Sequence, residues 1–246
     1  MRRIYILILI SITSIIIFAS CQLLFNPDFS NKSGLNQPAG YASNQVVFYM
    51  AGADGINRAC YWTGTNQTIL ANGGYAKSIY ICNGTPYIAG YDGTTACYWT
   101  GSKETPLVNG TGMSANSIFV KDGIIYVGGY ANISSANYAC YWVDNTVVTN
   151  GKTGVTYSIC LDENNNVFWT GYLYNSPNNF YEENTSGLND ITGCNLQSIF
   201  IDNNNTLYIA GQDNSSYACF WKGSSLNETI LSNKNGLPVT GPRVLG

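Results

Sequence analysis

A single tetrapeptide, Ala-Cys-Tyr-Trp, recurs along this chain and constrains its fold more than any other feature of the sequence. It occurs three times, and a fourth copy has Phe in place of Tyr; the copies begin at Ala59, Ala96, Ala139 and Ala218. Their cysteines are 37, 43 and 79 residues apart, and the last step is close to two repeats of about 40 residues. We therefore expect one supersecondary unit to be stacked several times.

Two further landmarks keep the same period. An aromatic strand that ends in a small residue and glycine occurs five times, with its final glycine at Gly52, Gly90, Gly129, Gly171 and Gly211. A Ser-Ile pair precedes four of these strands, at Ser78, Ser117, Ser158 and Ser198. The fourth repeat has lost the tetrapeptide, with Phe180-Tyr181 near its place and a longer polar insertion over residues 174–184.

Each repeat holds four short runs that are typical of β-strands. In the second repeat they cover residues 78–82, 86–90, 96–100 and 105–108, and they are separated by Asn83-Gly84, Asp92-Gly93 and Asn109-Gly110. Such dipeptides supply the positive φ angles of tight hairpin turns. Four strands in about 40 residues indicate the blade of a β-propeller. An extended β-solenoid or a stack of hairpins is the alternative.

The number of repeats predicts an all-β fold, a five-bladed β-propeller of four-stranded blades over residues 45–246. The first blade lacks its opening strand. The C-terminal Arg243-Val244-Leu245-Gly246 follows Asn235-Gly236 at the offset at which the Ser117 strand follows Asn109-Gly110. Because an open ring leaves unpaired strand edges, we expect residues 242–246 to close the ring. Residues 35–41 are the competing source of that strand.

The repeats also resemble the Tyr-Val-Ala-Gly-Tyr and Tyr-Trp repeats of uncharacterised bacterial β-propeller proteins, which are often secreted or lipid-anchored. Ala89-Gly90-Tyr91-Asp92-Gly93 and Ala96-Cys97-Tyr98-Trp99 carry the likeness, which covers residues 45–246. The chain has no His and lacks the Gly-His and Trp-Asp marks of WD repeats. The resemblance implies a fold and an envelope setting, but no activity.

The N-terminus has the pattern of a bacterial lipoprotein signal. Arg2 and Arg3 precede an apolar run that is too short for a transmembrane helix, and the run ends in Phe18-Ala19-Ser20-Cys21. This ending resembles a lipobox, although Phe18 stands where Leu is usual. The resemblance implies lipidation of Cys21, cleavage before it and acylation of the new N-terminus. We expect a signal peptide over residues 1–20 and a flexible tether over residues 21–44. We also expect attachment to the outer membrane or the cell surface. An uncleaved anchor or an ordinary secretory signal is the alternative.

The composition argues against nucleic acid as a partner. The formal net charge is −3, and only 10% of the residues are charged, against the usual quarter or so. The sequence contains no basic patch that could track a phosphate backbone. We expect a monomer whose surface polarity comes from Asn, Ser, Thr and Gly.

The cysteines predict buried free thiols rather than disulfides or a metal site. Four of them hold equivalent positions in different repeats, too far apart for a bridge. No Cys-x-x-Cys pair and no His occur, so we expect no zinc site and no cofactor.

Catalytic groups are scarce in this sequence. Without His the commonest general base is absent, and a glycosidase would need two carboxylates that converge on the central channel. Asp54, Asp92 and Asp213 follow the glycine-ended strand in equivalent places, either as turn caps or as a ring of ligand contacts. The recurring tryptophans could stack on sugars, but packing between blades is the favoured interpretation.

We therefore predict a lipid-anchored binding or interaction module for a glycan or protein, and not an enzyme. A glycoside hydrolase and a purely structural envelope lipoprotein are the alternatives. The irregular fourth repeat is the first place to look for a ligand. The candidate ligand-binding residues are Tyr174, Phe180, Tyr181, Asp54, Asp92 and Asp213, with Cys21 as the lipidation site.

Overall fold

The computed structural model of the chain describes residues 3–6, 18–25, 46–175, 179–190, 194–213, 217–223 and 227–231. These residues form twenty β-strands joined by turns and contain no helix, so the all-β prediction is confirmed. Within these ranges no helical segment has the length and apolar character to cross a membrane.

The strands form four antiparallel sheets, each wound in chain order. The first contains β1 (Arg3–Ile6), β2 (Phe18–Phe25), β3 (Val46–Ala53), β4 (Ala59–Thr63) and β5 (Asn66–Ile69). The second contains β6 (Tyr75–Cys82), β7 (Thr85–Asp92), β8 (Thr95–Thr100) and β9 (Lys103–Thr111).

The third sheet is the largest, with seven strands: β10 (Ala115–Lys121), β11 (Ile124–Ile133), β12 (Ala136–Val143), β13 (Thr146–Leu161), β14 (Val167–Leu173), β15 (Asn179–Glu183) and β16 (Asn189–Asp190). The fourth contains β17 (Asn195–Ile201), β18 (Leu207–Gln212), β19 (Ala218–Lys222) and β20 (Asn227–Ile230).

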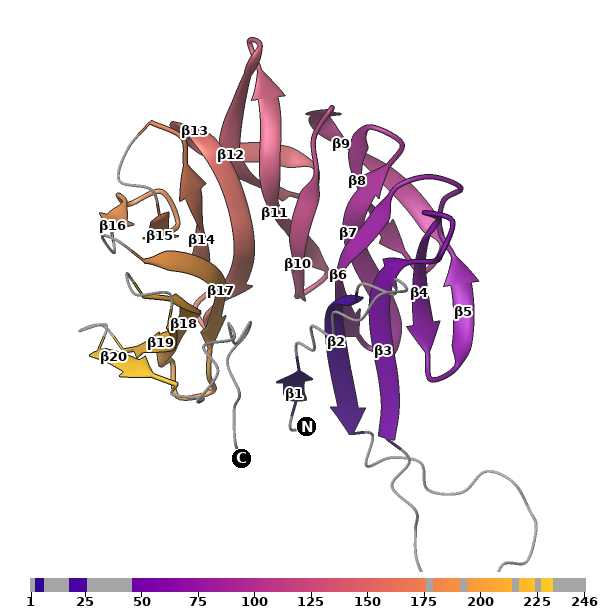
Figure 1. Cartoon of the computed structure of the whole chain (residues 1–246), viewed down its shortest axis with the longest axis horizontal. Coiled ribbons are helices and arrows are strands. Elements are labelled where there is room, and N and C mark those ends of the chain that lie inside the picture. The colour runs from indigo at the N-terminus through magenta and orange to yellow at the C-terminus, as the bar shows by residue number, and fades with distance from the viewer. Residues whose placement is uncertain are drawn as a thin grey trace, which may run out of the picture.

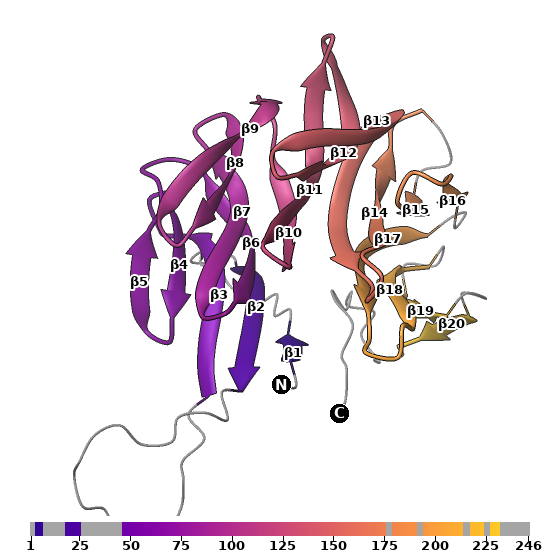
Figure 2. The same ribbon diagram turned by 180° about the vertical axis from the view of Figure 1, so that it is seen from behind.

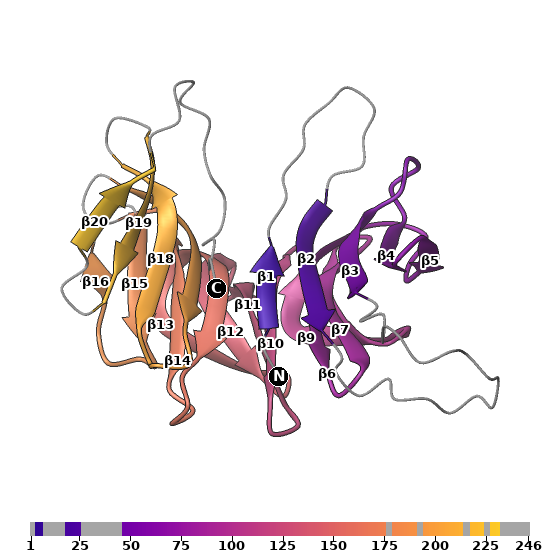
Figure 3. The same cartoon turned by 90° about the horizontal axis from the view of Figure 1, so that it is seen from below.

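The sheets are arranged like the blades of a propeller, along an open arc (Figure 1). Strands β2, β6, β10, β13 and β17 lie on the inner side of the arc, and β5, β9, β16 and β20 lie on its outside, as the view from behind also shows (Figure 2). From below, the sheets stand on edge beside one another, with β1 and β2 at the mouth of the arc opposite β18 (Figure 3). The propeller-like arrangement that the repeats predict is therefore present.

The prediction of five separate blades is wrong. The five sequence repeats are distributed over four sheets, because the 16-residue strand β13 is continuous. Its first half, from Thr146 to Thr153, pairs with β12, and its second half, from Gly154 to Leu161, pairs with β14. One strand therefore ends the third repeat and opens the fourth, with a register shift against β12 and a φ of 75° at Gly151 in its first half.

The predicted closure by the C-terminal strand is also wrong, and residues 35–41, the alternative source of that strand, lie outside the described residues. The strand that pairs with β3 in front of the first repeat is β2, Phe18–Phe25. In β2, Ser20 pairs with Ala51, just as Ser78 of the second repeat pairs with Ala89. The segment that resembles a lipobox thus has the register of a Ser-Ile strand. Residues 232–246 lie outside the described residues.

Turn chemistry explains the hairpins. Asn83 and Gly84 join β6 to β7 with φ values of 49° and 77°, and Gly93 joins β7 to β8 with a φ of 55°. Both turns are confirmed, since positive φ at such positions matches the twist of the paired strands. The third predicted turn, Asn109-Gly110, lies within β9 instead and joins no pair of strands.

The tetrapeptide forms the third strand of each unit, as predicted, and its Trp faces a smaller apolar residue on the second strand. Trp99 pairs with Ile88, Trp142 with Val127 and Trp221 with Ile209. In the fourth repeat the large residue is on the second strand instead of the third: Trp169 of β14 faces Glu182 of β15. Trp169 is fully buried and its ring meets that of Phe180 edge-on, with centroids 5.0 Å apart. The lost tetrapeptide Trp is replaced from the neighbouring strand.

The core lies between successive repeats, and one of its clusters joins the two repeats of the third sheet. One buried cluster joins Ala51 and Ala59 to Ile88 and Trp99 of the next sheet. Trp99, Trp142 and Trp221 are buried, which confirms the packing role predicted for them, whereas Trp62 is half-buried. The fold therefore depends on contacts between neighbouring repeats.

Seven cysteines of the described repeats form no disulfide with one another, as the sequence predicts: Cys60, Cys82, Cys97, Cys140, Cys160, Cys194 and Cys219. Burial is the main cause of raised thiol pKa values at Cys60, Cys97, Cys140 and Cys160. These side chains act as small buried apolar groups. No cluster of metal-ligating side chains occurs among the described residues.

In three of the four Ser-Ile pairs the Ser connects neighbouring inner strands. The hydroxyl of Ser78 accepts a hydrogen bond from the backbone N–H of Ile118 at 3.3 Å. Ser117 and Ser158 repeat this contact with the backbone N–H groups of Ile159 and Ile199, both at 3.2 Å. The repeated Ser therefore stabilises the next repeat along the chain.

Replacing one of these serines by Ala should destabilise the protein. We expect Ser158→Ala to lower the free energy of unfolding by about 1–3 kcal/mol, because the buried N–H of Ile199 loses its acceptor. Ser198 is the matched control, since its hydroxyl accepts no such bond from any described residue. Chemical denaturation of both variants measures the difference, and equal effects would contradict this role.

Candidate functional site

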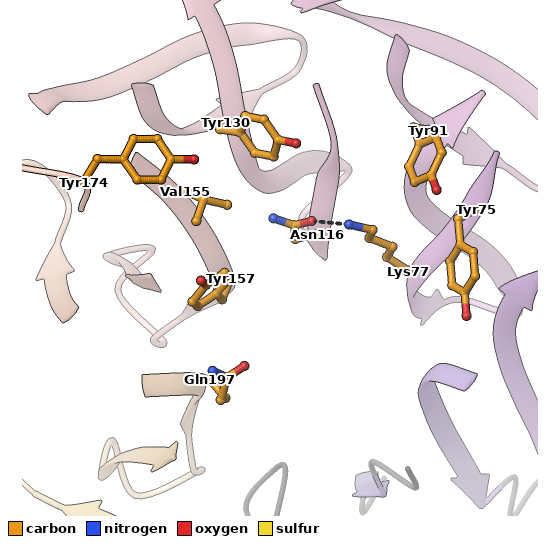
Figure 4. Close-up of a pocket in the computed structure, with 9 residues that line it drawn as sticks. All are labelled: Tyr75, Lys77, Tyr91, Asn116, Tyr130, Val155, Tyr157, Tyr174 and Gln197. Carbon is orange, nitrogen blue, oxygen red and sulfur yellow. Dashed lines mark hydrogen bonds between the residues drawn. The ribbon is translucent and has the colours of Figure 1, made fainter. Parts of the chain in front are cut away.

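The inner strands enclose a hollow of about 660 Å³ inside the arc. This volume is within the range of small-molecule sites. Figure 4 shows its side chains around an open centre, with Tyr75 and Tyr91 opposite Tyr157 and Tyr174. Nine residues line it: Tyr75, Lys77, Tyr91, Asn116, Tyr130, Val155, Tyr157, Tyr174 and Gln197.

Four of the lining residues occupy one equivalent position in successive repeats. Each inner strand has a β-bulge just before the Ser of its Ser-Ile pair, and one residue there has no partner on the adjoining strand. A bulge leaves an extra residue outside the ladder and redirects its side chain. The four unpaired residues all line the hollow: Lys77, Asn116, Tyr157 and Gln197.

The tyrosines come mainly from the strand ends next to these bulges. Tyr91 and Tyr130 directly follow the repeated glycine on β7 and β11, and Tyr75 pairs with Tyr91 across the sheet. Tyr174 lies in the turn after β14, and its ring centroid is 6.0 Å from that of Tyr172. Five aromatic rings thus surround the hollow on rigid strands or directly beside them.

Hydrogen bonds fix the one lysine of the hollow. Lys77 Nζ donates to Asn116 Oδ1 at 3.0 Å and lies 5.7 Å from the ring centroid of Tyr91 (Figure 4). Asn116 Oδ1 also accepts from Ser114 Oγ at 3.3 Å, and Asn116 Nδ2 donates to the backbone oxygen of Thr156 at 2.8 Å. The amide of Asn116 is therefore anchored to the next inner strand, and it positions the ammonium group of Lys77.

Burial raises the pKa values of three phenols of the hollow further above neutral pH. It raises the pKa of Tyr75 to about 12, and the neighbouring Tyr91 adds to this shift. Burial also raises the pKa values of Tyr130 and Tyr157, with a smaller contribution from Tyr174 to each. At neutral pH these hydroxyl groups can therefore donate hydrogen bonds to a bound molecule.

The three aspartates that the sequence singled out lie in turns or, for Asp92, at a strand end, and none of them lines the hollow. Asp54 Oδ1 accepts from the backbone N–H groups of Ile56 and Arg58 at 3.2 and 2.9 Å, and its Oδ2 forms an ion pair with Arg58 at 2.7 Å. Asp213 Oδ1 accepts from the backbone N–H of Tyr217 at 2.8 Å. Asp92 ends β7 and pairs with Thr95 across the turn. Asp54 and Asp213 thus cap turns, as their structural interpretation predicts.

The other candidate residues are separated by the fold. Tyr174 lines the hollow and is 50% exposed, which makes it accessible to a ligand. Phe180 is buried against Trp169, and Tyr181 is a half-buried neighbour of the cluster around Cys160 and Trp221. Cys21 lies in β2 opposite Met50. The irregular repeat therefore contributes one residue of the predicted set to the hollow.

Sequence reasoning missed most of the lining. The signal that could have found it is the residue directly before each Ser-Ile pair, which is Lys77, Asn116, Tyr157 or Gln197. This position varies while its neighbours repeat. A variable position within a constant strand is typical of a surface that is free to serve a ligand rather than the core.

No family model matches the chain, and no curated protein is a significant match. Among solved structures, the chain is similar to a protein of unknown function from Bacteroides caccae, with 12% identity and a TM-score of 0.49 over 78% of this chain and 76% of that one. It is also similar to the extracellular domain of a protein assigned as a hybrid two-component system from B. thetaiotaomicron, with 12% identity and a TM-score of 0.40 over 76% of this chain. The chain spans about a third, 34%, of that second protein.

Proposed function

We propose that this protein is a binding module that holds a small polar ligand, such as a glycan unit, in the hollow between its inner strands. The observation that carries the proposal is the lining, in which five tyrosines and three polar side chains from successive repeats face one space of about 660 Å³. Aromatic faces with a few hydrogen-bonding groups are typical of ligand pockets. Because these side chains come from strands and from bulges within them, the backbone already places them around the hollow before a ligand binds.

A binding role fits the lining better than catalysis does. Glycoside hydrolysis requires two carboxyl groups about 5–10 Å apart at the scissile bond. None of the nine lining residues is Asp or Glu. Asp54 and Asp202 instead accept hydrogen bonds from backbone N–H groups of their own turns.

The proposed setting is the bacterial cell envelope, with a monomer attached to a membrane through lipid on Cys21. The support is the apolar N-terminal run that ends in Phe18-Ala19-Ser20-Cys21. Cleavage before Cys21 would leave residues 21–25 of β2 paired with β3. Several acyl chains on one residue would hold the folded part stably at the surface.

Removing one ring from the hollow should weaken binding without unfolding the protein. The full chain is screened against glycan and peptide arrays, and its best ligand is measured by calorimetry. We expect Tyr174→Ala to weaken this ligand about tenfold, since the loss of one ring contact is worth on the order of 1.4 kcal/mol.

Tyr217→Ala is the matched control, because Tyr217 is 51% exposed and Tyr174 is 50% exposed, but only Tyr174 lines the hollow. The control should bind as the unaltered chain does. Equal affinity of the two variants, or a folded chain that binds nothing on either array, would contradict the proposal.

A further inference from the structure

The hollow contains one formal charge, the ammonium group of Lys77. The other eight lining residues are tyrosines, amides and Val155, which are neutral at pH 7. The chain as a whole is acidic, with a formal charge of −3. A single positive group therefore lies at the centre of a negatively charged protein.

No described carboxylate compensates this charge. The one resolved ion pair of the described residues joins Arg58 to Asp54, and neither of them lines the hollow. Asn116 is the one described residue that accepts a hydrogen bond from Lys77 Nζ, which has three N–H donors. Burial lowers the pKa of Lys77, whereas an adjacent carboxylate would raise it. Two of the three N–H donors of Lys77 are therefore open to an anion that enters the hollow.

The surroundings of Lys77 suit a sugar ring. The ammonium group faces the ring of Tyr91, and Tyr130, Tyr157 and Tyr174 lie on the other side of it (Figure 4). Gln197 adds an amide, which donates to Asn195 Oδ1 at 2.7 Å and keeps its own carbonyl oxygen as an acceptor. Rings provide apolar faces for C–H groups, and the hydroxyl and amide groups pair with sugar hydroxyls.

We propose that the hollow binds an acidic glycan, in which a uronic acid residue places its carboxylate on Lys77 while its ring lies against the tyrosines. This inference rests on the proposed binding function and names its ligand class. Lys77 forms a charge-assisted hydrogen bond to the carboxylate, and Asn116 is a positioning residue that holds the ammonium group toward the open centre.

A carboxylate fits this site better than a phosphate. One lysine neutralises one negative charge, and a carboxylate carries one. A phosphate monoester carries about −1.5 to −2 at pH 7 and would remain partly uncompensated in a half-buried site. Phosphate sites in proteins commonly add an Arg or a helix N-terminus, and the lining has neither.

The test compares two ligands that differ only in charge. Calorimetry measures the full chain with an oligogalacturonate and with its methyl ester, in which each carboxylate is neutral. We expect the acid form to bind at least tenfold more tightly, with an affinity that falls as salt is raised. Lys77→Met should weaken the acid form about 10- to 100-fold, the range for a hydrogen bond to a charged group.

Binding of the methyl ester shows whether a variant is still folded, because the ester needs the same hollow but carries no charge. Lys77→Met should weaken binding of the ester by a smaller factor than binding of the acid, because the ester carbonyl is a neutral acceptor. Lys103→Met, at an exposed residue outside the hollow, should leave both ligands unchanged. Equal binding of acid and ester by the unaltered chain would overturn the acidic-glycan inference but leave a neutral-glycan site in place. Binding of neither, while the arrays yield another ligand that Tyr174→Ala weakens, would overturn the inference and retain the proposed function.

Discussion

Replacing Trp142 by Ala should destabilise the protein more than any other single truncation in the tetrapeptide repeats. Trp142 is fully buried, and its Nε1 donates to the backbone oxygen of Val108 in the preceding sheet at 2.9 Å. Its ring packs in the cluster that contains Leu107 and Met113. We expect a loss of about 3–5 kcal/mol in the free energy of unfolding, the cost of truncating a large buried aromatic side chain.

The same substitution at Trp62 is the matched control. Trp62 holds the equivalent position in the first repeat but is half-buried, so its truncation removes less buried surface. Urea denaturation and calorimetry measure both variants; each kcal/mol lowers the Tm by roughly 2–4 °C for a chain of this size. If Trp62→Ala were as destabilising as Trp142→Ala, burial between successive sheets would not be the source of the effect.

The repeat pattern predicted the strands well, because it reflects local rules. Alternating apolar residues and Asn-Gly turns specify hairpins within one repeat, and the predicted runs 78–82, 86–90 and 96–100 all lie within β6, β7 and β8. The packing of Trp99 and Trp142 also followed, since a strand buried on both faces has no exposed position for a ring.

The joints between repeats were less predictable, because a strand can serve two neighbours. Residues 146–161 form the single strand β13 although Asn150-Gly151 lies within it and Gly151 has a φ of 75°, and the two halves pair with different partners. The first repeat takes its opening strand from Phe18–Phe25, a segment whose composition also satisfies a targeting signal. Two interpretations of one short segment cannot be separated by periodicity alone.

The hollow escaped prediction because it depends on bulges. Strict alternation would place Lys77 and Ser78 on opposite faces of a regular strand. The bulge between Ala76 and Ser78 breaks that alternation and leaves Lys77 outside the ladder. The bulge itself contains no glycine or proline that would mark it in the sequence. The position is visible only when the repeats are aligned and the variable residue before Ser-Ile is noticed.

The glycine opposite each bulge offers the sharpest test of this geometry. A Cβ atom at Gly90 would overlap the backbone carbonyl oxygen of Tyr75, and Gly171 and Gly211 face the carbonyl oxygens of Val155 and Asn195 in the same way. We expect Gly90→Ala to cost about 3 kcal/mol or more in the free energy of unfolding, since no side-chain rotation can relieve a clash with backbone. The repeated glycine is thus a consequence of the bulge.

Gly55→Ala is the control, because a Cβ there meets nothing within 4 Å. Its free energy of unfolding should stay within about 0.5 kcal/mol of the unaltered chain. Because Tyr75 lines the hollow and would have to move away from the added methyl group, ligand affinity should fall in Gly90→Ala at temperatures where that variant is still folded. A Gly90→Ala chain that matched Gly55→Ala in both stability and affinity would show that the bulged strands neither require this glycine nor shape the site through it.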